Sequence, residues 1–424
     1  MRIVLATSRF TDSGGGVAVY AREFCSLLSE RGNEILVIST EPDLAEEWIF
    51  GDREIRAVSF PVSGDRKTQC ETARRMFERI VAFDPDVLVS SDHSWLVSFF
   101  PCFARRRVRI SICHSSCARP IVLPAVARPE ATDWIVTLSE AGAGWVVRHT
   151  QARQDQVVAI YNPVPEAGAP SRDAILRRAA ERPLRLVFPG GSNGNKGADV
   201  MLRLAAAIQK SDMDCELVWM GRDLIQRYIP PESRNWIRLT GLVSHEEAEA
   251  QIARAHCLFL PSRGEGCPMT LLEALRSGCI PFVSDRPSAM RELVRDGESG
   301  FVLPVPEFSN LVGRLSDLAR SVELCQRLML GACCVYEEKL GSERWVHDIM
   351  PLLERGRSGR MAGPERDVFD ASCLSLWHRR KGTWMAPSLE FLKDRMAMGA
   401  HLVRCTLAGR EFRRVIRESK QTGN

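Results

Sequence analysis

The chain has 424 residues, more than one hydrophobic core usually holds, so its length predicts two domains. Its 45% hydrophobic and 26% charged residues are typical of a globular protein and exclude a disordered one. The apolar run nearest in length to a membrane span, 96–104, is shorter than the roughly 20 residues that such a span needs.

The first half alternates apolar runs with helical patterns. We expect Arg2–Ala6 to be a first strand and not a secretory signal, because a long apolar core and a cleavage site are missing there. An amphipathic helix follows over 17–28, and the Pro- and Gly-rich stretch 162–170 is typical of a linker. The other strands expected in this half are Glu34–Ser39, Asp86–Ser90, Arg109–Cys113, Trp134–Ser139 and Val157–Tyr161.

The second half repeats this alternation and then becomes helical from 308 to 353. Its expected strands are Leu184–Phe188, Glu216–Met220, Trp236–Thr240, Cys257–Leu260, Ile280–Ser284 and Gly300–Leu303. Two blocks of alternating strands and helices predict an α/β protein with two doubly wound, Rossmann-like domains facing each other across a cleft. The boundaries we predict are 1–165, a linker at 166–182, 183–354, and a flexible joint with a helical tail at 355–424.

The most informative segment, Arg263–Leu275, combines a Gly-rich loop with the start of a helix. Pro268 suits the first helical turn, and the amides of Met269–Leu271 are expected to lack intrahelical partners and to form an anion site. Glu265 precedes that site, and Glu273 lies roughly 7–8 Å beyond it along the helix. A phosphate on the amides, with sugar hydroxyls on both carboxylates, would fit a nucleotide-sugar. The alternative is two unrelated surface glutamates.

A further glycine-rich turn follows the first strand of each of the two blocks. Phe188–Gly197 contains Gly190 and ends beside Lys196, and it lacks the Walker A spacing, so we expect it to contact phosphate through backbone and ammonium. The turn with Gly15 and Gly16 lacks the third glycine of a dinucleotide fingerprint. It is either a tight turn without a ligand or a loop that approaches the cleft from the other side.

His114 ends the strand Arg109–Cys113, where open α/β sheets bind ligands, so we predict a catalytic or sugar-contacting role. His93 has a similar location, and for it a structural role is the stronger interpretation. Asp84-Pro-Asp86 matches a metal-binding DxD in letters, but it precedes a strand and indicates a turn. Cys113, His114 and Cys117 lack a second ligand pair, so we predict no metal and expect the fourteen cysteines to be buried free thiols.

With these motifs in place, residues 1–354 resemble the retaining family-4 glycosyltransferases of the GT-B fold. In the second half, the matching residues are Lys196, Gly197, Gly241, Pro261, Ser262, Glu265, Gly266, Leu272, Glu273, Ala274, Gly278, Pro281 and Glu292. In the first half, they are Gly14–Gly16, Pro85–Val87, His114, Ser139, Glu140 and Asn162.

The resemblance implies transfer of a sugar from a nucleotide donor, without a metal or other cofactor and with retained anomeric configuration. It gives Glu265 the donor-sugar hydroxyls, Glu273 the ribose and Lys196 the diphosphate, and it places His114 near the reactive carbon. His114, Lys196 and Glu265 are therefore the expected catalytic residues. The other expected donor contacts are Gly15, Gly16, Gly190, Arg263, Gly266, Cys267, Pro268, Met269, Thr270 and Leu271.

One position departs from the family. An arginine usually stands five residues before the phosphate lysine, and this chain has Gly191 there. Loss of one preorganised donor costs about 3–4 kcal/mol of transition-state stabilisation. We hypothesise that Arg263, at the mouth of the neighbouring loop, replaces it.

The C-terminal tail is basic. Residues 377–420 hold eleven Lys or Arg and four Asp or Glu, a net charge of +7, so the rest of the chain carries −3 of the total of +4. We expect these residues to form an amphipathic helix. It could lie on an anionic membrane, which suits a lipid-linked acceptor; the alternative is a helix packed on the protein. The scarcity of aromatics among the basic residues argues against nucleic acid.

The leading hypothesis is a cytoplasmic glycosyltransferase for a bacterial surface glycan or glycoconjugate, either free or peripheral on the inner face of the plasma membrane. Its partners would be a nucleotide-sugar and a glycan or lipid-linked acceptor. Two alternatives stay open: a nucleotide-sugar epimerase of the same fold, and a sugar-nucleotide-binding scaffold whose missing arginine marks weakened catalysis.

Overall fold

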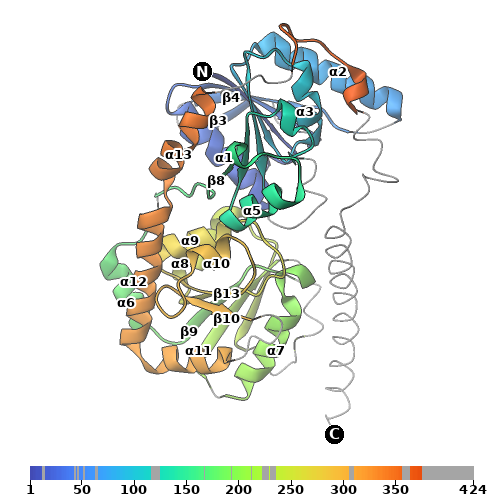
Figure 1. Cartoon of the computed structure of the whole chain (residues 1–424). Helices are drawn as coiled ribbons and strands as arrows, with labels where there is room; N and C mark the ends of the chain where they lie inside the picture. The colour runs from blue at the N-terminus through green and yellow to red at the C-terminus, as the bar shows by residue number, and fades with distance from the viewer. Residues whose placement is uncertain are drawn as a thin grey trace.

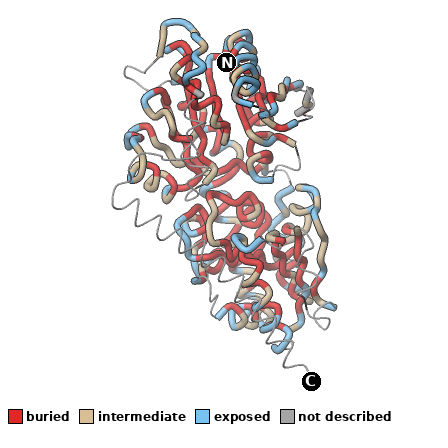
Figure 2. Tube along the Cα trace, turned by 90° about the vertical axis from the view of Figure 1, so that its right-hand side faces the viewer, coloured by how far each residue is buried: buried red, intermediate tan, exposed pale blue. Residues whose placement is uncertain are grey.

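The computed structural model describes residues 1–11, 15–42, 44, 47–50, 53–62, 65–115, 125–166, 168–191, 193–211, 213–221, 229, 235–304, 310–355 and 363–374. It contains two α/β domains, one above the other in Figure 1. Figure 2 shows that buried residues concentrate in the strands of both sheets and along one side of the covering helices. The predicted fold class is confirmed.

The N-terminal sheet has eight strands in the order β3-β4-β2-β1-β5-β6-β7-β8, all parallel except β3, which runs antiparallel to β4. Its strands are β1 (Arg2–Thr7), β2 (Glu34–Ser39), β3 (Glu47–Phe50), β4 (Arg53–Ser59), β5 (Val87–Ser91), β6 (Val108–Cys113), β7 (Trp134–Thr137) and β8 (Val157–Ala159). The helices described with it are α1 (Gly15–Ser29), α2 (Arg66–Phe83), α3 (Ser94–Phe99) and α5 (Glu140–His149). The central strands are buried on both faces, which explains their continuous apolar runs.

The C-terminal sheet has six parallel strands in the order β11-β10-β9-β12-β13-β14. They are β9 (Leu184–Phe188), β10 (Cys215–Met220), β11 (Ile237–Gly241), β12 (Cys257–Leu260), β13 (Ile280–Ser284) and β14 (Phe301–Leu303). The helices described with it are α6 (Arg172–Ala180), α7 (Ala198–Gln209), α8 (His245–Arg254), α9 (Met269–Ser277), α10 (Ala289–Leu293), α11 (Leu311–Arg320) and α12 (Val322–Lys339), and the last helix of the chain's described part is α13 (Ser342–Glu354).

The chain crosses between the domains a second time near its end. Helix α12 packs on α6 and α9 of the C-terminal domain, and α13 continues to the N-terminal domain, where it packs against α1 and β6 (Figure 1). Trp345 of α13 makes edge-to-face contacts with Tyr20 and Phe24 of α1. Sequence alternation alone grouped α13 with residues 183–354, but its contacts belong to the other domain.

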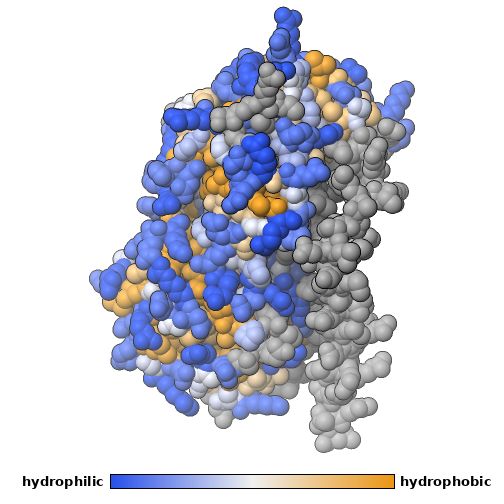
Figure 3. Space-filling model, viewed as in Figure 1, coloured by the Kyte–Doolittle hydropathy of each residue, from blue (hydrophilic) through white to orange (hydrophobic). Residues whose placement is uncertain are grey.

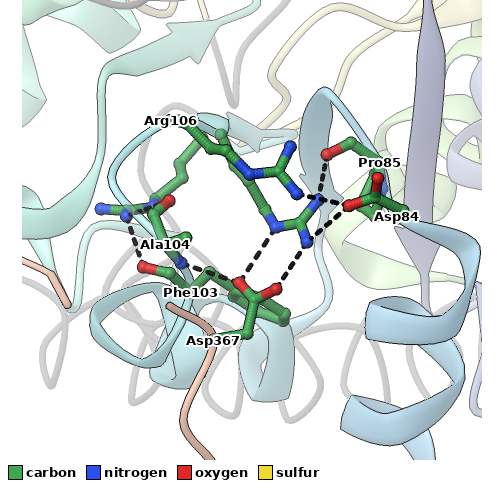
Figure 4. A network of polar contacts seen from close by, with 8 residues as sticks. Asp84, Pro85, Phe103, Ala104, Arg106 and Asp367 are labelled. Carbon is green, nitrogen blue, oxygen red and sulfur yellow. Dashed lines mark hydrogen bonds and ion pairs between the residues drawn. The ribbon is translucent and has the colours of Figure 1, made fainter. Parts of the chain in front are cut away.

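Residues 363–374, which we call the C-terminal strap, also lie on the N-terminal domain. Asp367 accepts hydrogen bonds from the Ala104 amide and from the buried guanidinium of Arg107 (Figure 4). Phe369 packs against Phe77 and Phe99. Within the region 355–424 that we predicted as joint and tail, residues 363–374 are therefore docked on the N-terminal domain, and residues 356–362 of the predicted joint lie outside the described residues. The amphipathic tail at 377–420 lies outside the described residues.

The described surface in Figure 3 is mostly hydrophilic, with smaller apolar areas between the charged side chains. In the part of the chain that the structure describes, no helix combines the length and apolar character that crossing a bilayer requires.

Asp84-Pro-Asp86 forms the predicted turn: Asp84 ends α2 and pairs with Arg106 and Arg107, and Asp86 accepts from the Arg2 amide at 2.8 Å.

Candidate active site

The loops at the carboxyl ends of β6 and β12 meet where the two domains touch. A Cβ on Gly266 would lie 2.3 Å from the carbonyl oxygen of His114, so only glycine permits this approach. The start of α1 reaches the same place, because a Cβ on Gly16 would lie 3.8 Å from Met269 Cγ at the start of α9. The structure thus brings together the motifs of both halves that the sequence placed at the cleft.

The N-terminus of α9 forms the centre of this junction. Pro268 precedes the helix as its N-cap residue, one position earlier than expected, and Cys267 is buried with its carbonyl accepting from the Asn162 side chain at 2.9 Å. The Leu271 amide donates to the Pro268 carbonyl at 3.0 Å. The expectation of three available amides is therefore wrong at Leu271, because a short turn closes there. Met269 and Thr270 remain as the amides of the anion site.

Lys196 and Glu265 lie beside this helix tip. Lys196 ends a short 3₁₀ turn, η5 (Gly194–Lys196), and its ammonium nitrogen lies 2.6 Å from Glu265 Oε1. The Glu265 side chain is 11% exposed and that of Lys196 is 37% exposed. The lysine is directed toward the loop before α9, so its charge and the helix tip can act on one anion.

Glycines allow the loop after β9, which contains Lys196, to pack closely against its surroundings. A Cβ on Gly190 would lie 2.0 Å from the Phe188 ring, and one on Gly197 would lie 2.4 Å from the Pro261 carbonyl oxygen. Gly197 also has a positive φ of 82°, which favours glycine. The close packing places Lys196 next to the end of β12.

Arg263 has a different role from the one that we hypothesised. Its guanidinium binds both carboxylate oxygens of Asp199, at 2.8 and 2.7 Å, and donates to the Gly194 carbonyl. The bidentate pair holds the guanidinium at the first turn of α7. The geometry does not support Arg263 as a substitute for the arginine that Gly191 replaces. Arg263 instead ties the two glycine-rich loops together.

Glu273 is the buried carboxylate of the site. The residue is 2% exposed, and neither carboxylate oxygen has a hydrogen-bond partner in the structure. The His245 ring lies nearby, with its Nε2 3.6 Å from Glu273 Oε1, and burial lowers the pKa of His245, so this imidazole is a neutral neighbour at pH 7. Burial raises the pKa of Glu273 to about 8, with a further contribution from Glu249.

A pocket of about 270 Å³ opens in front of Glu273, between the two domains. Residues of α1, α8, α9 and the interdomain linker line it. Arg22 and Arg276 lie on its wall, as does Glu23, whose pKa burial raises to about 7. A buried carboxylate without partners stabilises a ligand that supplies hydrogen-bond donors, such as a pair of hydroxyls.

His114 ends β6 on the N-terminal side of the junction. Its Nε2 lies 2.8 Å from the hydroxyl oxygen of Ser91, and its ring packs edge-to-face on Tyr20. Burial lowers the pKa of His114, so the imidazole is neutral at pH 7. A neutral imidazole can exchange hydrogen bonds with a sugar hydroxyl without adding charge.

Asp92 and His93 directly follow β5, whose last residue, Ser91, contacts His114. Asp92 has a positive φ of 55° and one buried oxygen without a hydrogen bond, and burial raises its pKa. His93 is 3% exposed and caps α3 by accepting from the Leu96 amide at 3.3 Å. His93 is therefore structural. Ser91 and Asp92 were not predicted as site residues, although both stand at the end of a strand.

Glu292 of α10 joins the two domains. Its carboxylate accepts from the amides of Glu140 and Ala141, at 3.0 and 2.8 Å, at the N-terminus of α5. The Tyr161 hydroxyl donates to it at 3.0 Å. Because α10 belongs to one domain and α5 to the other, this carboxylate holds the loops of the junction together. Sequence spacing could not reveal a contact between domains.

Fold and site together define the class of protein. Residues 14–167 match the family model described as Glycosyltransferase Family 4, and residues 183–321 match Glycosyl transferases group 1. The chain belongs to the family-4 glycosyltransferases and has the GT-B fold.

Individual relatives agree with this class. The chain is 28% identical to alpha-D-kanosaminyltransferase of Streptomyces kanamyceticus over 163 residues, which span 36% of this chain and 42% of that one, less than half of its length. The structure of Anabaena HepE in complex with UDP-glucose is similar with a TM-score of 0.66 and 15% identity, covering 84% and 99% of the two chains. WaaG, a glycosyltransferase involved in lipopolysaccharide biosynthesis, is similar with a TM-score of 0.62 and 15% identity, covering 84% and 100%.

Proposed function

We propose that this glycosyltransferase moves a sugar from a nucleotide-sugar to a hydroxyl of a surface-glycan or lipid-linked acceptor, with retention and without a metal. The observation that carries the proposal is the helix tip of α9, flanked by the Lys196–Glu265 pair on one side and by the unpartnered Glu273 carboxylate on the other. Similarity to HepE, whose structure contains UDP-glucose, supports the donor class, and similarity to WaaG supports the acceptor class.

The donor fits the junction in one direction. The diphosphate would lie on Lys196 and the amides of Met269 and Thr270, where positive charge gathers. The ribose hydroxyls would enter the pocket and donate to Glu273. Glu265, released from Lys196 by the incoming phosphate, would accept from the donor-sugar hydroxyls, and His114 would contact the same sugar from the opposite domain.

The transfer step balances without a protein base. The bond between the anomeric carbon and the phosphate oxygen breaks, and its electron pair leaves with the nucleoside diphosphate. The acceptor oxygen bonds to the same face of that carbon and gives its proton to the departing phosphate. Lys196 and the helix tip stabilise the negative charge that develops, and the site, enclosed between domains, limits hydrolysis.

A second function is favoured by one observation. Gly191 replaces the usual arginine, and Arg263 is engaged with Asp199, so the site carries one cation fewer than expected. A protein that binds nucleotide-sugars and turns them over weakly would have this arrangement. Binding without transfer to any acceptor would distinguish it from the proposed enzyme.

The test begins with thermal-shift measurements against UDP-, GDP-, ADP- and dTDP-sugars. A donor at 100 times its Kd stabilises the folded state by about 2.7 kcal/mol, which raises Tm by several degrees. The stabilising donor is then incubated with lipid-linked acceptors, with and without EDTA, and the product anomer is assigned by NMR. Failure of every nucleotide-sugar to raise Tm would refute the proposed donor class.

A matched pair of variants assigns the binding to this site. Lys196→Ala removes the charge at the helix tip, whereas Lys210→Ala removes an exposed charge at the other end of α7. The thermal shift should be smaller in Lys196→Ala and unchanged in Lys210→Ala.

A further inference from the structure

The C-terminal strap carries a pair of thiols that the proposed reaction does not use. Cys373, in the short 3₁₀ helix η8 (Ala371–Leu374), lies with its sulfur 3.3 Å from that of Cys102 in the N-terminal domain. Both are free cysteines, and they are 7% and 4% exposed. Among the described residues, this is the one sulfur–sulfur contact recorded.

The contact is held from both sides by the packing of the strap. The Val368 amide donates to the Cys102 carbonyl at 2.9 Å, and Asp367 binds Arg107. Phe369 packs on Phe77 and Phe99, next to the same helical turn. The two sulfurs are therefore fixed neighbours, and they need to approach by only a little over 1 Å to reach the bonded distance of about 2.05 Å.

We propose that Cys102 and Cys373 form a site of reversible covalent modification, an intramolecular disulfide produced by a peroxide-class oxidant. The adjacent thiol of Cys102 lowers the pKa of Cys373, which favours Cys373 as the first sulfur to react, and the 3.3 Å contact places Cys102 to attack it next. Hydrogen peroxide is small enough to reach a pair that larger oxidants contact poorly.

The chemistry balances in two steps. The Cys373 thiolate attacks one peroxide oxygen, the O–O bond breaks, and a sulfenic acid and one water form after protonation. The Cys102 sulfur then attacks the Cys373 sulfur, the S–O bond breaks, and the disulfide and a second water form. Two thiols are oxidised by two electrons in total, and one peroxide is reduced. A thiol reductant reverses the reaction.

The consequence is a covalent attachment of the strap to the N-terminal domain. In the reduced protein, noncovalent contacts hold the strap on the N-terminal domain. The disulfide closes a ring between positions 102 and 373, which restricts the unfolded chain and raises the melting temperature. It also fixes the origin of the basic residues 377–420 on this domain.

The full-length protein is treated with hydrogen peroxide, its remaining thiols are alkylated, and it is digested without reduction for mass spectrometry. We expect one dominant linked peptide pair joining Cys102 to Cys373, which dithiothreitol removes. Recovery of both cysteines as free thiols, under conditions that oxidise the exposed Cys334, would overturn the proposal. Linkage of either cysteine to a different partner would also overturn it.

A stability measurement with two variants provides an independent readout. Oxidation should raise Tm of the wild type and of Cys334→Ser by several degrees and should leave Tm of Cys373→Ser unchanged. Cys373 lies near the end of the described chain, so its conservative replacement spares the core around Cys102. An equal rise in Cys373→Ser would contradict the site. Neither result depends on the proposed sugar transfer.

Discussion

The two carboxylates beside α9 differ in their partners. Glu265 forms an ion pair with Lys196, whereas Glu273 has no hydrogen bond to either oxygen and a pKa raised to about 8 by burial. A ligand that binds Lys196 or Glu265 must first break their ion pair. A ligand that binds Glu273 supplies hydrogen bonds that its carboxyl oxygens lack in the free protein. If the proposed function is correct, we expect donor affinity to come mainly from the Glu273 pocket and catalysis mainly from Lys196.

The largest expected effect separates these two ends. Lys196→Ala should lower kcat by roughly 100- to 1000-fold, because one preorganised donor contributes about 3–4 kcal/mol to stabilising a developing anion. KM for the donor should change less than kcat. Steady-state kinetics with the stabilising donor measure both constants, with Lys210→Ala as the control. A variant with wild-type kcat would remove Lys196 from the mechanism.

Glu273→Gln should act on binding instead. Replacing the carboxyl group with an amide should weaken nucleotide binding by roughly 10-fold, about 1.4 kcal/mol, because the amide nitrogen cannot accept a hydrogen bond from a ribose hydroxyl. Isothermal titration with the nucleoside diphosphate measures this effect. Glu247→Gln, an exposed change on α8, is the control. Unchanged affinity in Glu273→Gln would show that the ribose lies elsewhere.

The same variant should be more stable than the wild type, in a pH-dependent way. The pKa of Glu273 is higher in the folded protein than its ordinary value of 4.5, so the folded state binds more protons between pH 4.5 and about 8. Wild-type stability therefore falls as pH rises through this window. Glu273→Gln should be about 1–3 kcal/mol more stable at pH 8 and nearly equal at pH 4.5. A difference in stability independent of pH would contradict the assignment.

Glu292→Gln tests whether both ends depend on domain closure. The amide cannot accept from all three donors at once, so we expect a several-fold loss of kcat, about 1 kcal/mol. Small-angle scattering should show a more extended protein. Glu298→Gln, an exposed change nearby, should alter neither measurement. Identical scattering curves would argue against a closing role.

The smallest effect is expected far from the site, in the strap. Asp367→Asn keeps an acceptor for the Ala104 amide, and Arg107 keeps its pair with Asp84 at 3.0 Å. We therefore expect a loss of roughly 1 kcal/mol in the free energy of unfolding and unchanged kinetics. Chemical denaturation measures the loss, with exposed Glu365→Gln as the control. Changed donor affinity would connect the strap to the site.

The sequence predicted the C-terminal sheet well because parallel strands buried on both faces read as continuous apolar runs, as in Cys257–Leu260. It missed β3 and β4, because Arg53, Glu54 and Arg56 interrupt the apolar pattern near the sheet edge. The motif residues around α9 were found because their spacing along one loop and helix fixes their positions.

Contacts between segments that are distant in the sequence could not be predicted from it. Nothing in the spacing of Arg263 reveals that Asp199 would bind it, and nothing near Glu292 indicates the amides of α5 across the junction. The engaged Leu271 amide depends on a single backbone turn. These details follow from the packing of loops and domains, which a local pattern does not encode.

The return of α13 and the strap to the first domain affects how the protein is made. A ribosome releases residues 1–165 long before it releases α13, which covers α1 and β6, and the strap, which covers Phe77. During synthesis this apolar face of the N-terminal domain stays uncovered until α13 and the strap have been made. Early termination near position 340 would leave that face exposed, and the shortened product should aggregate or require a chaperone.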